Sequence, residues 1–353
     1  MEIHQILPAL SYEDAVSNDA IEIRNVLRNM GYVSNIYAKY VHEQISKATY
    51  PLKKYKKNPN NIVIYHFSLG DLDVTKFVKL LPDIKVLMYH NITPHYYFKG
   101  INDELAQLCR NGRYELKSLS KDIKLALGVS EYNRKELLDY GFINTDVLPI
   151  IVDFSKYDLI PNNKIIQNFD DGYVNLLFVG RIAPNKKQED LIKTFIYYKR
   201  INPKSRLFII GSPEGMDKYY AKLQFLIEKL DLNDVFLTGK VEYEDLLAYY
   251  TIADVFISMS EHEGFCVPLI EAMYFKVPII AYNSTAIPDT LNHAGILINK
   301  KKYVEIAEMI ELIVKNHDLQ TRLIDGQTHR LKHFNKSNTE DVLRIHIERL
   351  AIK

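Results

Sequence analysis

The fold is decided by one stretch, EHEGFCVPLIEAM at residues 261–273. It follows the apolar run 254–258 and precedes the apolar run 277–281, so the pattern predicts a strand, a short loop, a helix and a second strand. Pro268 fits the first turn of this helix, where a missing N–H is tolerated. Two carboxylates flank the helix start, Glu263 in the loop and Glu271 within the helix.

The start of such a helix is a binding site for an anion. It offers unpaired backbone N–H groups and a partial positive charge, which suit a phosphate group. Carboxylates accept hydrogen bonds from hydroxyl groups, so Glu263 and Glu271 suit the sugars on either side of that phosphate. The stretch therefore predicts a nucleotide diphosphate sugar as the ligand.

The same alternation of apolar runs and helical patterns extends along the chain. In the first half, short apolar runs predict strands at 3–7, 33–37, 62–65, 86–89, 125–129 and 147–149. Helical patterns between them predict helices at 18–30, 101–119 and 131–139. A polar, turn-rich segment covers 161–172, and the alternation restarts with runs at 175–179, 206–210, 235–238, 255–258, 279–282 and 295–298. Strands alternating with helices predict parallel sheets covered on both faces.

We therefore predict an α/β protein of two doubly wound, Rossmann-like domains that face each other across a cleft. The N-terminal domain is expected over 1–165 and the C-terminal domain over 172–335. The segment 336–353 has helical spacing, and its packing partner stays open, a return to the N-terminal domain being one option. In doubly wound sheets, ligands bind at the carboxyl ends of the strands.

Composition narrows the choice of partners and location. The chain of 353 residues has a formal net charge of +1, which gives no general attraction to nucleic acid. Its two cysteines form no metal pattern, and no run of about 18 apolar residues is long enough to span a bilayer. The absence of an apolar leader leads us to expect a reducing cytoplasm.

A second candidate site is GRIAPNK at residues 180–186, directly after an apolar strand. Gly180 permits a tight turn, and Arg181 and Lys186 then lie at the strand's carboxyl end. Arg binds a phosphate through two hydrogen bonds, and Lys adds a point charge. A solvated charged loop is the alternative for this segment alone. The two glutamates about eighty residues later favour a ligand site.

Together, these two segments resemble the retaining glycosyltransferases of family GT4, which have the GT-B fold. The resemblance covers most of the chain and is strongest over 175–295. It implies that Arg181 and Lys186 hold the donor diphosphate and that Glu271 holds the nucleotide ribose. It places Glu263 beside the transferred sugar. The remaining donor-binding groups that it implies are Gly180, the backbone around Gly264, Phe265, Cys266 and Val267, and Val241 near the base.

The N-terminal half resembles the family less closely. YHNITP at 89–94 resembles the segment with the strand-end histidine that contacts the donor sugar, here His90; a core histidine is the alternative. The loop 11–19 resembles the Asp-Ala-Val-Ser-Asn version of the first loop, so Asp14 and Asn18 are expected on the acceptor side. Asn18 as a plain helix N-cap is equally consistent. PIIVD at 149–153 departs from the family's Pro-Asn-Gly-Val-Asp.

The resemblance implies transfer of a sugar to a hydroxyl group of a glycan, a lipid-linked acceptor or a small molecule, with retained anomeric configuration. Arg181, Lys186 and the helix N-terminus would stabilise the leaving diphosphate without a metal or other cofactor. A front-face substitution, in which the leaving phosphate deprotonates the acceptor, fits this site. Glu263 as a covalent nucleophile is the weaker option. Domain closure would limit hydrolysis of the donor.

Several alternatives stay open. DLD at 71–73 follows an apolar run, as a metal-binding motif of another transferase fold does, although Gly70 favours a turn and a helix cap. A GT-B isomerase or phosphorylase and a non-catalytic nucleotide-sugar-binding protein would use similar residues. A nicotinamide oxidoreductase is disfavoured because no G-x-G-x-x-G follows a strand. The basic stretch 53–57 is either a solvated loop or a contact with anionic lipid at the inner membrane face.

Overall fold

In the computed structural model, which describes residues 1–11 and 14–351, the chain divides into two compact units. Unit 1 takes its described residues from Met1–Tyr96, Glu104–Asp153 and Phe334–Lys353. Unit 2 comprises Tyr97–Asp103 and Phe154–His333. Unit 2 thus begins earlier than the predicted linker, because the aromatic side chains of the 3-10 helix η4 (Phe154–Asp158) pack on Tyr274 and Phe275.

The described residues of unit 1 form a seven-stranded parallel sheet in the order β3-β2-β1-β4-β5-β6-β7. Its strands are β1 (Ile3–Leu10), β2 (Ile36–Val41), β3 (Tyr50–Pro51), β4 (Ile62–Phe67), β5 (Ile84–Tyr89), β6 (Leu125–Gly128) and β7 (Thr145–Val147). Its helices are α1 (Ala15–Asn29), α2 (Leu72–Lys79), α3 (Asp103–Leu119), α4 (Glu131–Asp139) and α13 (Lys336–Ala351). Every residue of β4 is buried, as expected for an inner strand covered on both faces.

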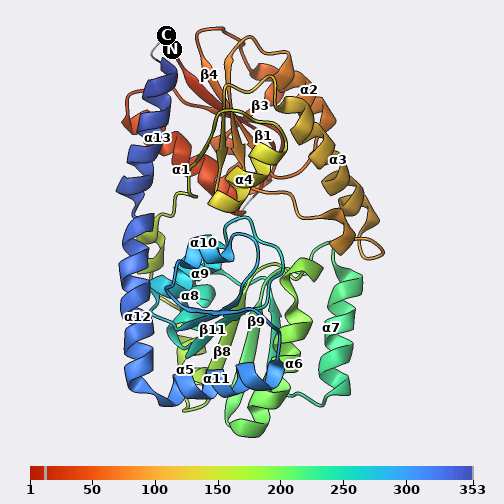
Figure 1. Ribbon diagram of the computed structural model, residues 1–353, viewed down its shortest axis with the longest axis vertical. Helices are drawn as coiled ribbons and strands as arrows, with labels where there is room; N and C mark the ends of the chain where they lie inside the picture. The colour runs from red at the N-terminus through yellow and green to blue at the C-terminus, as the bar shows by residue number, and fades with distance from the viewer. Residues whose placement is uncertain (12–13, 352–353) are drawn as a thin grey trace. The chain divides into compact units, whose positions relative to one another are not determined.

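The last helix, α13, packs on unit 1 beside α1 (Figure 1). The Lys336 ammonium lies 2.8 Å from a carboxylate oxygen of Glu22 on α1. Leu343 and Ile347, four residues apart on α13, are both buried. Four-residue spacing places two side chains on one helix face, so this face of α13 covers the core of unit 1.

The described residues of unit 2 form a six-stranded parallel sheet in the order β10-β9-β8-β11-β12-β13. Its strands are β8 (Val174–Val179), β9 (Ser205–Ile210), β10 (Val235–Gly239), β11 (Val255–Ser258), β12 (Ile279–Tyr282) and β13 (Ile296–Ile298). Its helices are α5 (Asn163–Phe169), α6 (Gln188–Ile201), α7 (Asp217–Lys229), α8 (Tyr243–Thr251), α9 (Val267–Tyr274), α10 (Ile287–Leu291), α11 (Tyr303–Lys315) and α12 (His317–Leu331). Both sheets have doubly wound strand orders, so the predicted α/β class is confirmed.

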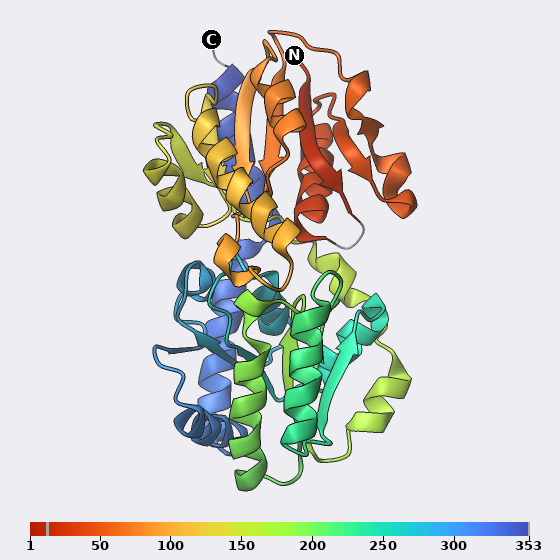
Figure 2. The same cartoon turned by 90° about the vertical axis from the view of Figure 1, so that its right-hand side faces the viewer.

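Helices cover both faces of the second sheet. Figure 2 shows α6 and α7 side by side in front of the strands. A core rich in aromatic side chains, including Phe208, Tyr249 and Phe256, packs with Leu269 and Met273 of α9. This packing fixes the position of α9, whose N-terminus is the predicted phosphate site.

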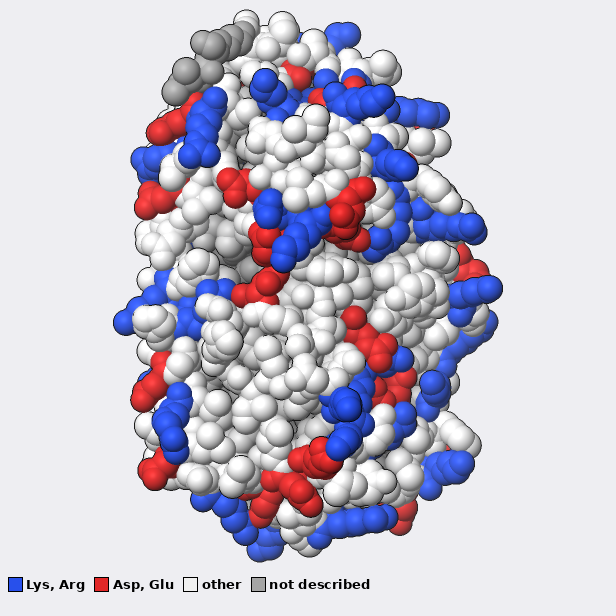
Figure 3. Space-filling model, viewed as in Figure 1, with Lys and Arg blue, Asp and Glu red and all other residues white. Residues whose placement is uncertain are grey.

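Two features concern possible contacts with nucleic acid and membranes, namely the distribution of surface charge and the length of the apolar helices. Over the described residues of the face in Figure 3, positive and negative side chains are interspersed. Among the helices of the described chain, none is long and apolar enough to cross a membrane.

Candidate active site

The candidate site of unit 2 lies where the strand order reverses. The sheet runs β10-β9-β8 in one direction and β11-β12-β13 in the other, so the reversal falls between β8 and β11. The loop that follows β8 holds the segment 180–186 singled out in the sequence, and the loop that follows β11 leads through the other segment, 261–273, into α9. Ligands of doubly wound sheets bind at this reversal, outside the carboxyl ends of the strands.

Glycines let the ends of neighbouring strands approach closely there. Gly180 follows β8, and its N–H donates to the Ile210 carbonyl at 2.9 Å. Gly211 follows β9 with a φ of +154°, and a Cβ atom at this position would lie 2.0 Å from the Gly180 carbonyl oxygen. No side chain fits such a gap, so Gly211 is required for this chain path.

The two segments are joined by an ion pair. The ammonium of Lys186, at the end of the 3-10 helix η5 (Pro184–Lys186), lies 2.7 and 2.6 Å from the two carboxylate oxygens of Glu263. Asn185 donates to the His262 carbonyl at 3.0 Å, and its own carbonyl accepts from the Glu261 N–H at 2.8 Å. The structure thus brings the predicted Lys186 and Glu263 together, and Asn185 holds the loops in register.

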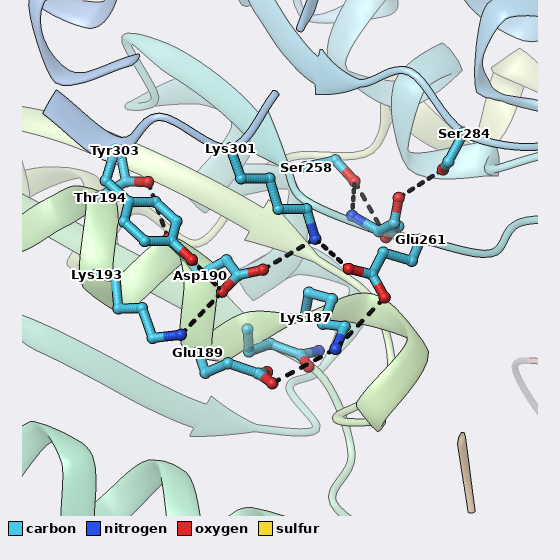
Figure 4. A network of polar contacts seen from close by, with 12 residues as sticks. Lys187, Glu189, Asp190, Lys193, Thr194, Ser258, Glu261, Ser284, Lys301 and Tyr303 are labelled. Carbon is cyan, nitrogen blue, oxygen red and sulfur yellow. Dashed lines mark hydrogen bonds and ion pairs between the residues drawn. The ribbon is translucent and has the colours of Figure 1, made fainter. Parts of the chain in front are cut away.

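A network of charged side chains supports these loops (Figure 4). The Lys301 ammonium lies 2.9 Å from Asp190 and 2.8 Å from Glu261, and Lys187 lies 3.4 Å from Glu261. Burial disfavours the charged form of Asp190, but the hydrogen bond and charge of Lys301 outweigh it, so the pKa of Asp190 lies below its usual value. The network ties the start of α6 to the loop that carries Glu263.

The N-terminus of α9 has the predicted anion-binding character. Cys266 precedes the helix with a left-handed φ of +73° and provides no side-chain cap. Among the described residues, the backbone N–H groups of Gly264, Cys266 and Val267 have no hydrogen-bond acceptor. The Phe265 side chain is buried in the core, and its backbone carbonyl accepts a hydrogen bond from the Thr290 hydroxyl.

Glu271, on α9, is held by two tyrosines. Tyr250 donates to one carboxylate oxygen at 2.7 Å, and Tyr157 donates to the other at 3.4 Å. Burial in the surrounding protein raises the pKa of Glu271 above its usual value, while both phenol hydrogen bonds oppose the rise. A hydrogen-bonded carboxylate in this setting is suited to accept hydrogen bonds from a diol.

The thiol of Cys266 lies among the charged groups of the site. Burial raises its pKa well above the usual value, Glu263 and Glu271 raise it further, and Lys186 lowers it. All three charges are therefore close enough to act on one atom. A thiol that keeps its proton is a poor nucleophile, so Cys266 has a packing role here.

Arg181 and Val241 complete the predicted donor residues. The Arg181 side chain is exposed just after the end of β8. Among the residues that the structure describes, it has no ion-pair partner. Its guanidinium is therefore available to an anion. Val241, after β10, is half-buried and packs against the core that contains α8 and α9.

The predicted residues of unit 1 lie near the first turn of α1 and after β5. His90 is largely buried, and its Nε2 atom lies 2.9 Å from Nδ1 of His66 on β4 and 3.9 Å from a carboxylate oxygen of Asp19. Asp14 is the N-cap of α1 and accepts from the Ser17 N–H at 3.0 Å. The helix therefore begins earlier than predicted, and the N-cap alternative for Asn18 is wrong. Residues 12 and 13 of the predicted loop lie outside the described residues.

The alternative metal motif at 71–73 has a structural role. Asp71 is the N-cap of α2 and accepts from the N–H groups of Asp73 and Val74, each at 3.1 Å. The Lys39 ammonium lies 3.0 Å from Asp71 and 2.8 Å from Asp73. The capping that Gly70 favoured is thus observed, and one lysine forms ion pairs with both carboxylates.

Residues 160–330 match the family described as "Glycosyl transferases group 1". The chain is 26% identical over 253 residues to a capsular polysaccharide biosynthesis glycosyltransferase, CapM, of Staphylococcus aureus, covering 69% of this chain and 62% of CapM. It is also 26% identical to a GDP-mannose-dependent phosphatidylinositol monomannoside mannosyltransferase of Corynebacterium glutamicum, covering 57% of this chain and 56% of that protein. The chain thus spans less than two thirds of the length of both relatives.

Solved structures show the same architecture over the whole chain. HepE of Anabaena, determined in complex with UDP-glucose, has a TM-score of 0.79 and 14% sequence identity. The match covers 99% of this chain and 100% of HepE. This likeness shows the fold, and the predicted GT-B fold is confirmed.

Proposed function

We propose that this protein transfers a sugar from a nucleotide diphosphate sugar to a hydroxyl group, because residues 160–330 match the family described as glycosyl transferases group 1. One observation carries the proposal. At the strand reversal of unit 2, Lys186 and Glu263 form an ion pair next to a helix start with unpaired N–H groups, and Glu271 lies within the same helix. Cations, N–H donors and carboxylates are the groups that a diphosphate between two sugars needs.

Each group has a proposed role toward the donor. Arg181 and Lys186 bind the diphosphate, together with the N–H groups of Gly264, Cys266 and Val267. Glu271, positioned by Tyr250 and Tyr157, accepts hydrogen bonds from the ribose hydroxyls. Val241 lies on the base side. His90 and Glu263 bind hydroxyl groups of the transferred sugar.

We propose a front-face substitution with retained configuration. The bond from the anomeric carbon to the phosphate oxygen breaks, and the acceptor oxygen forms its bond on the same face. The leaving phosphate oxygen takes the acceptor's proton. Negative charge grows on the diphosphate during this step, and fixed positive groups at that position stabilise the transition state. Arg181, Lys186 and the start of α9 supply this charge, so the proposed reaction needs no divalent metal.

The geometry favours a binding role for Glu263 over a covalent one. Both of its carboxylate oxygens lie within 2.7 Å of the Lys186 ammonium. An oxygen engaged by a cation is a weaker nucleophile, because its negative charge is already stabilised. When Lys186 binds a phosphate instead, the Glu263 carboxylate is available to accept hydrogen bonds from hydroxyl groups.

For the acceptor, we propose a hydroxyl group on a glycan or a lipid-linked sugar, with Asn18 on the acceptor side. The C. glutamicum relative is named for a phosphatidylinositol mannoside, which supports a lipid-linked acceptor. Lys53, Lys54, Lys56 and Lys57 are exposed on unit 1 and could contact anionic headgroups at the cytoplasmic face of a membrane. Flotation with anionic vesicles would show salt-sensitive binding, lost when these lysines become glutamine. Equal flotation of both proteins would remove the membrane part of the proposal.

The first experiment is thermal unfolding with a panel of UDP, GDP, ADP and their common sugars in EDTA. A ligand at one hundred times its dissociation constant stabilises the folded state by about 2.7 kcal/mol. We expect one nucleotide series to raise the melting temperature of the wild type and to have no effect on Glu271→Ala and Arg181→Ala. Turnover of the radiolabelled donor then separates an enzyme from a binding protein, and product analysis separates transfer from isomerisation or phosphorolysis. Binding that needs a divalent metal would contradict the proposal.

A further inference from the structure

A row of polar side chains runs through the buried centre of unit 1, across three neighbouring strands. Gln5 lies on β1, His66 on β4, and His90 directly after β5. The Gln5 amide nitrogen donates to the Ala20 carbonyl at 3.0 Å, and its amide oxygen lies 2.8 Å from His66 Nε2. His66 Nδ1 then lies 2.9 Å from His90 Nε2.

This row allows one arrangement of protons. A carbonyl only accepts, so the Gln5 amide must turn its nitrogen to Ala20 and its oxygen to His66. His66 Nε2 therefore carries a hydrogen, and its Nδ1 is an acceptor in the neutral ring. His90 Nε2 must then be the donor, which leaves His90 Nδ1 as a bare acceptor. Burial lowers the pKa of His90 to about 3 and that of His66 well below 6.5, so both rings are neutral at ordinary pH.

The geometry favours this hydrogen-bonded chain over a metal site. Asp19, His66 and His90 are close enough to be considered as ligands, with the candidate atoms within 4.8 Å of one another. However, the two imidazole planes differ by only 19°, and the ring centroids are 5.2 Å apart with the facing nitrogens at 2.9 Å. Nearly coplanar rings at this spacing point their facing nitrogens at each other. A metal would need both nitrogens at about 2.0–2.1 Å and directed at a third point.

Two further observations concern the imidazole of His90. Its Nδ1 atom is buried and has no hydrogen-bond partner within the described chain. Asp19 is fully buried, is fixed by the Ile151 N–H at 2.9 Å, and places its other oxygen 3.9 Å from His90 Nε2. Burial raises the pKa of Asp19 to about 7, and in its charged form this carboxylate favours a proton on Nε2. A buried acceptor without a partner is uncommon in a native protein, and His90 Nδ1 is therefore a candidate acceptor for a donor group of a ligand.

We infer that Gln5 and His66 are positioning residues that hold His90 as the Nε2–H tautomer, so that Nδ1 accepts a hydrogen bond from a hydroxyl group of the sugar ligand. The inference rests on the proposed function for the identity of the ligand. The tautomer itself is a property of the free protein. A histidine with the other tautomer would present an N–H to the same hydroxyl and select a different orientation of that group.

The test is long-range proton–nitrogen NMR of the full chain labelled with ¹⁵N-histidine. The chain has 11 histidines, and the substitutions His66→Asn and His90→Asn assign the two signals. His4 is an internal reference, because its Nδ1 accepts from the Asn35 N–H at 3.3 Å and must be bare. We expect the ¹⁵N chemical shift of His90 Nδ1 to be that of a nitrogen without a proton. When the donor sugar nucleotide is added, this shift should move toward that of the hydrogen-bonded His4 Nδ1. The nucleoside diphosphate without the sugar should leave it unchanged.

Two variants separate positioning from general stability. His66→Asn keeps a carbonyl oxygen near the position of Nδ1, whereas His66→Leu removes the acceptor for His90. We expect His66→Leu to shift His90 toward a mixture of tautomers and to lower kcat/KM by about 3- to 10-fold, the equivalent of one hydrogen bond. His66→Asn should restore both the tautomer and most of the rate. Gln5→Met should loosen the tautomers of both histidines.

Three results would overturn the inference. These are a protonated Nδ1 in wild-type His90, an unchanged His90 tautomer in His66→Leu, and a shift of both histidine signals by added Zn²⁺ that EDTA reverses. The tautomer is read without substrate, so its failure is distinct from failure of the proposed function. If no sugar nucleotide binds while the tautomer is as expected, the proposed function fails and the positioning roles of Gln5 and His66 stand.

Discussion

The hydrogen bond from Tyr250 to Glu271 makes a prediction about how donor binding depends on pH. Glu271 must be a carboxylate to accept hydrogen bonds from both ribose hydroxyls. Burial raises its pKa above the usual value for a glutamate, so binding should be lost as the pH falls through this raised pKa. Tyr250 stabilises the carboxylate through a 2.7 Å hydrogen bond. Tyr250→Phe should therefore raise the pKa further and move the loss of binding to higher pH.

The size of the shift follows from the strength of that bond. A hydrogen bond to a charged group contributes about 1.5–3 kcal/mol, and one pKa unit corresponds to about 1.36 kcal/mol. Tyr250→Phe should thus move the midpoint of binding upward by about one to two pH units. Isothermal titration calorimetry with the intact sugar nucleotide, between about pH 5 and pH 8, would measure it. The intact donor is suitable because its diphosphate is esterified at both ends and does not titrate in this range.

Two variants make this measurement decisive. Tyr198 is a buried tyrosine of the same unit whose phenol donates to Glu311 at 3.1 Å, so Tyr198→Phe removes a comparable bond away from the site. It should leave the midpoint unchanged. Glu271→Gln should weaken binding and abolish the pH dependence. The reasoning is refuted if Tyr250→Phe and the wild type share one midpoint, or if Glu271→Gln keeps the full pH dependence.

Three further predictions concern stability and the metal alternative. Lys186→Met leaves the nearly buried Glu263 without its ion-pair partner and should lower the free energy of unfolding by about 3 kcal/mol. The double variant with Glu263→Gln should recover part of this loss. Urea unfolding measures both variants, and additive effects of the two substitutions would contradict a direct pair. Gly172 has a φ of +81° and open space at the position of a Cβ, so Gly172→Ala should cost roughly 1–2 kcal/mol from backbone strain alone. Gly211→Ala should destabilise the protein by more, because its Cβ would also meet the Gly180 carbonyl oxygen. Equal melting temperatures of the two variants would contradict this close approach. Asp71→Ala removes the N-cap of α2 and should lower the free energy of unfolding by about 1 kcal/mol, while turnover in EDTA stays unchanged. A loss of turnover that Mn²⁺ reverses would restore the metal interpretation.

Features encoded by neighbouring residues could be predicted from the sequence. Helix α4 has the predicted bounds, because Ser130 caps its start and Gly141 follows its end with a φ of +91°. The loops that carry Lys186 and Glu263 were also predicted, since each directly follows an apolar strand. The start of α1 was misplaced because a capping aspartate was taken for part of a ligand loop.

Features that depend on contacts between distant segments were not predicted. The contact between His66 and His90 requires β4 and β5 to be neighbours with a particular register. Its only signal in the sequence was a histidine near the end of an apolar strand. The support of Glu271 by Tyr250 requires α8 to pack on the face that carries α9, and a tyrosine in an apolar helix gives no such indication. Strand order and helix packing carry this information.

Each unit contains polar groups that have no hydrogen-bond partner among the described residues. Unit 1 has a buried acceptor in His90 Nδ1, and unit 2 has free N–H donors at the start of α9 and the exposed cation of Arg181. A buried polar group without a partner costs about 1–3 kcal/mol. This cost applies to His90 Nδ1, because Arg181 is exposed and the residues at the start of α9 are only partly buried. A phosphate alone satisfies the groups of unit 2 and leaves His90 unpaired, whereas a hydroxyl-bearing sugar satisfies His90 alone. On the proposed function, a sugar hydroxyl that donates to His90 Nδ1 removes the cost of leaving this atom unpaired, so a nucleotide sugar should bind more tightly than the nucleotide by the contribution of the His90 contact.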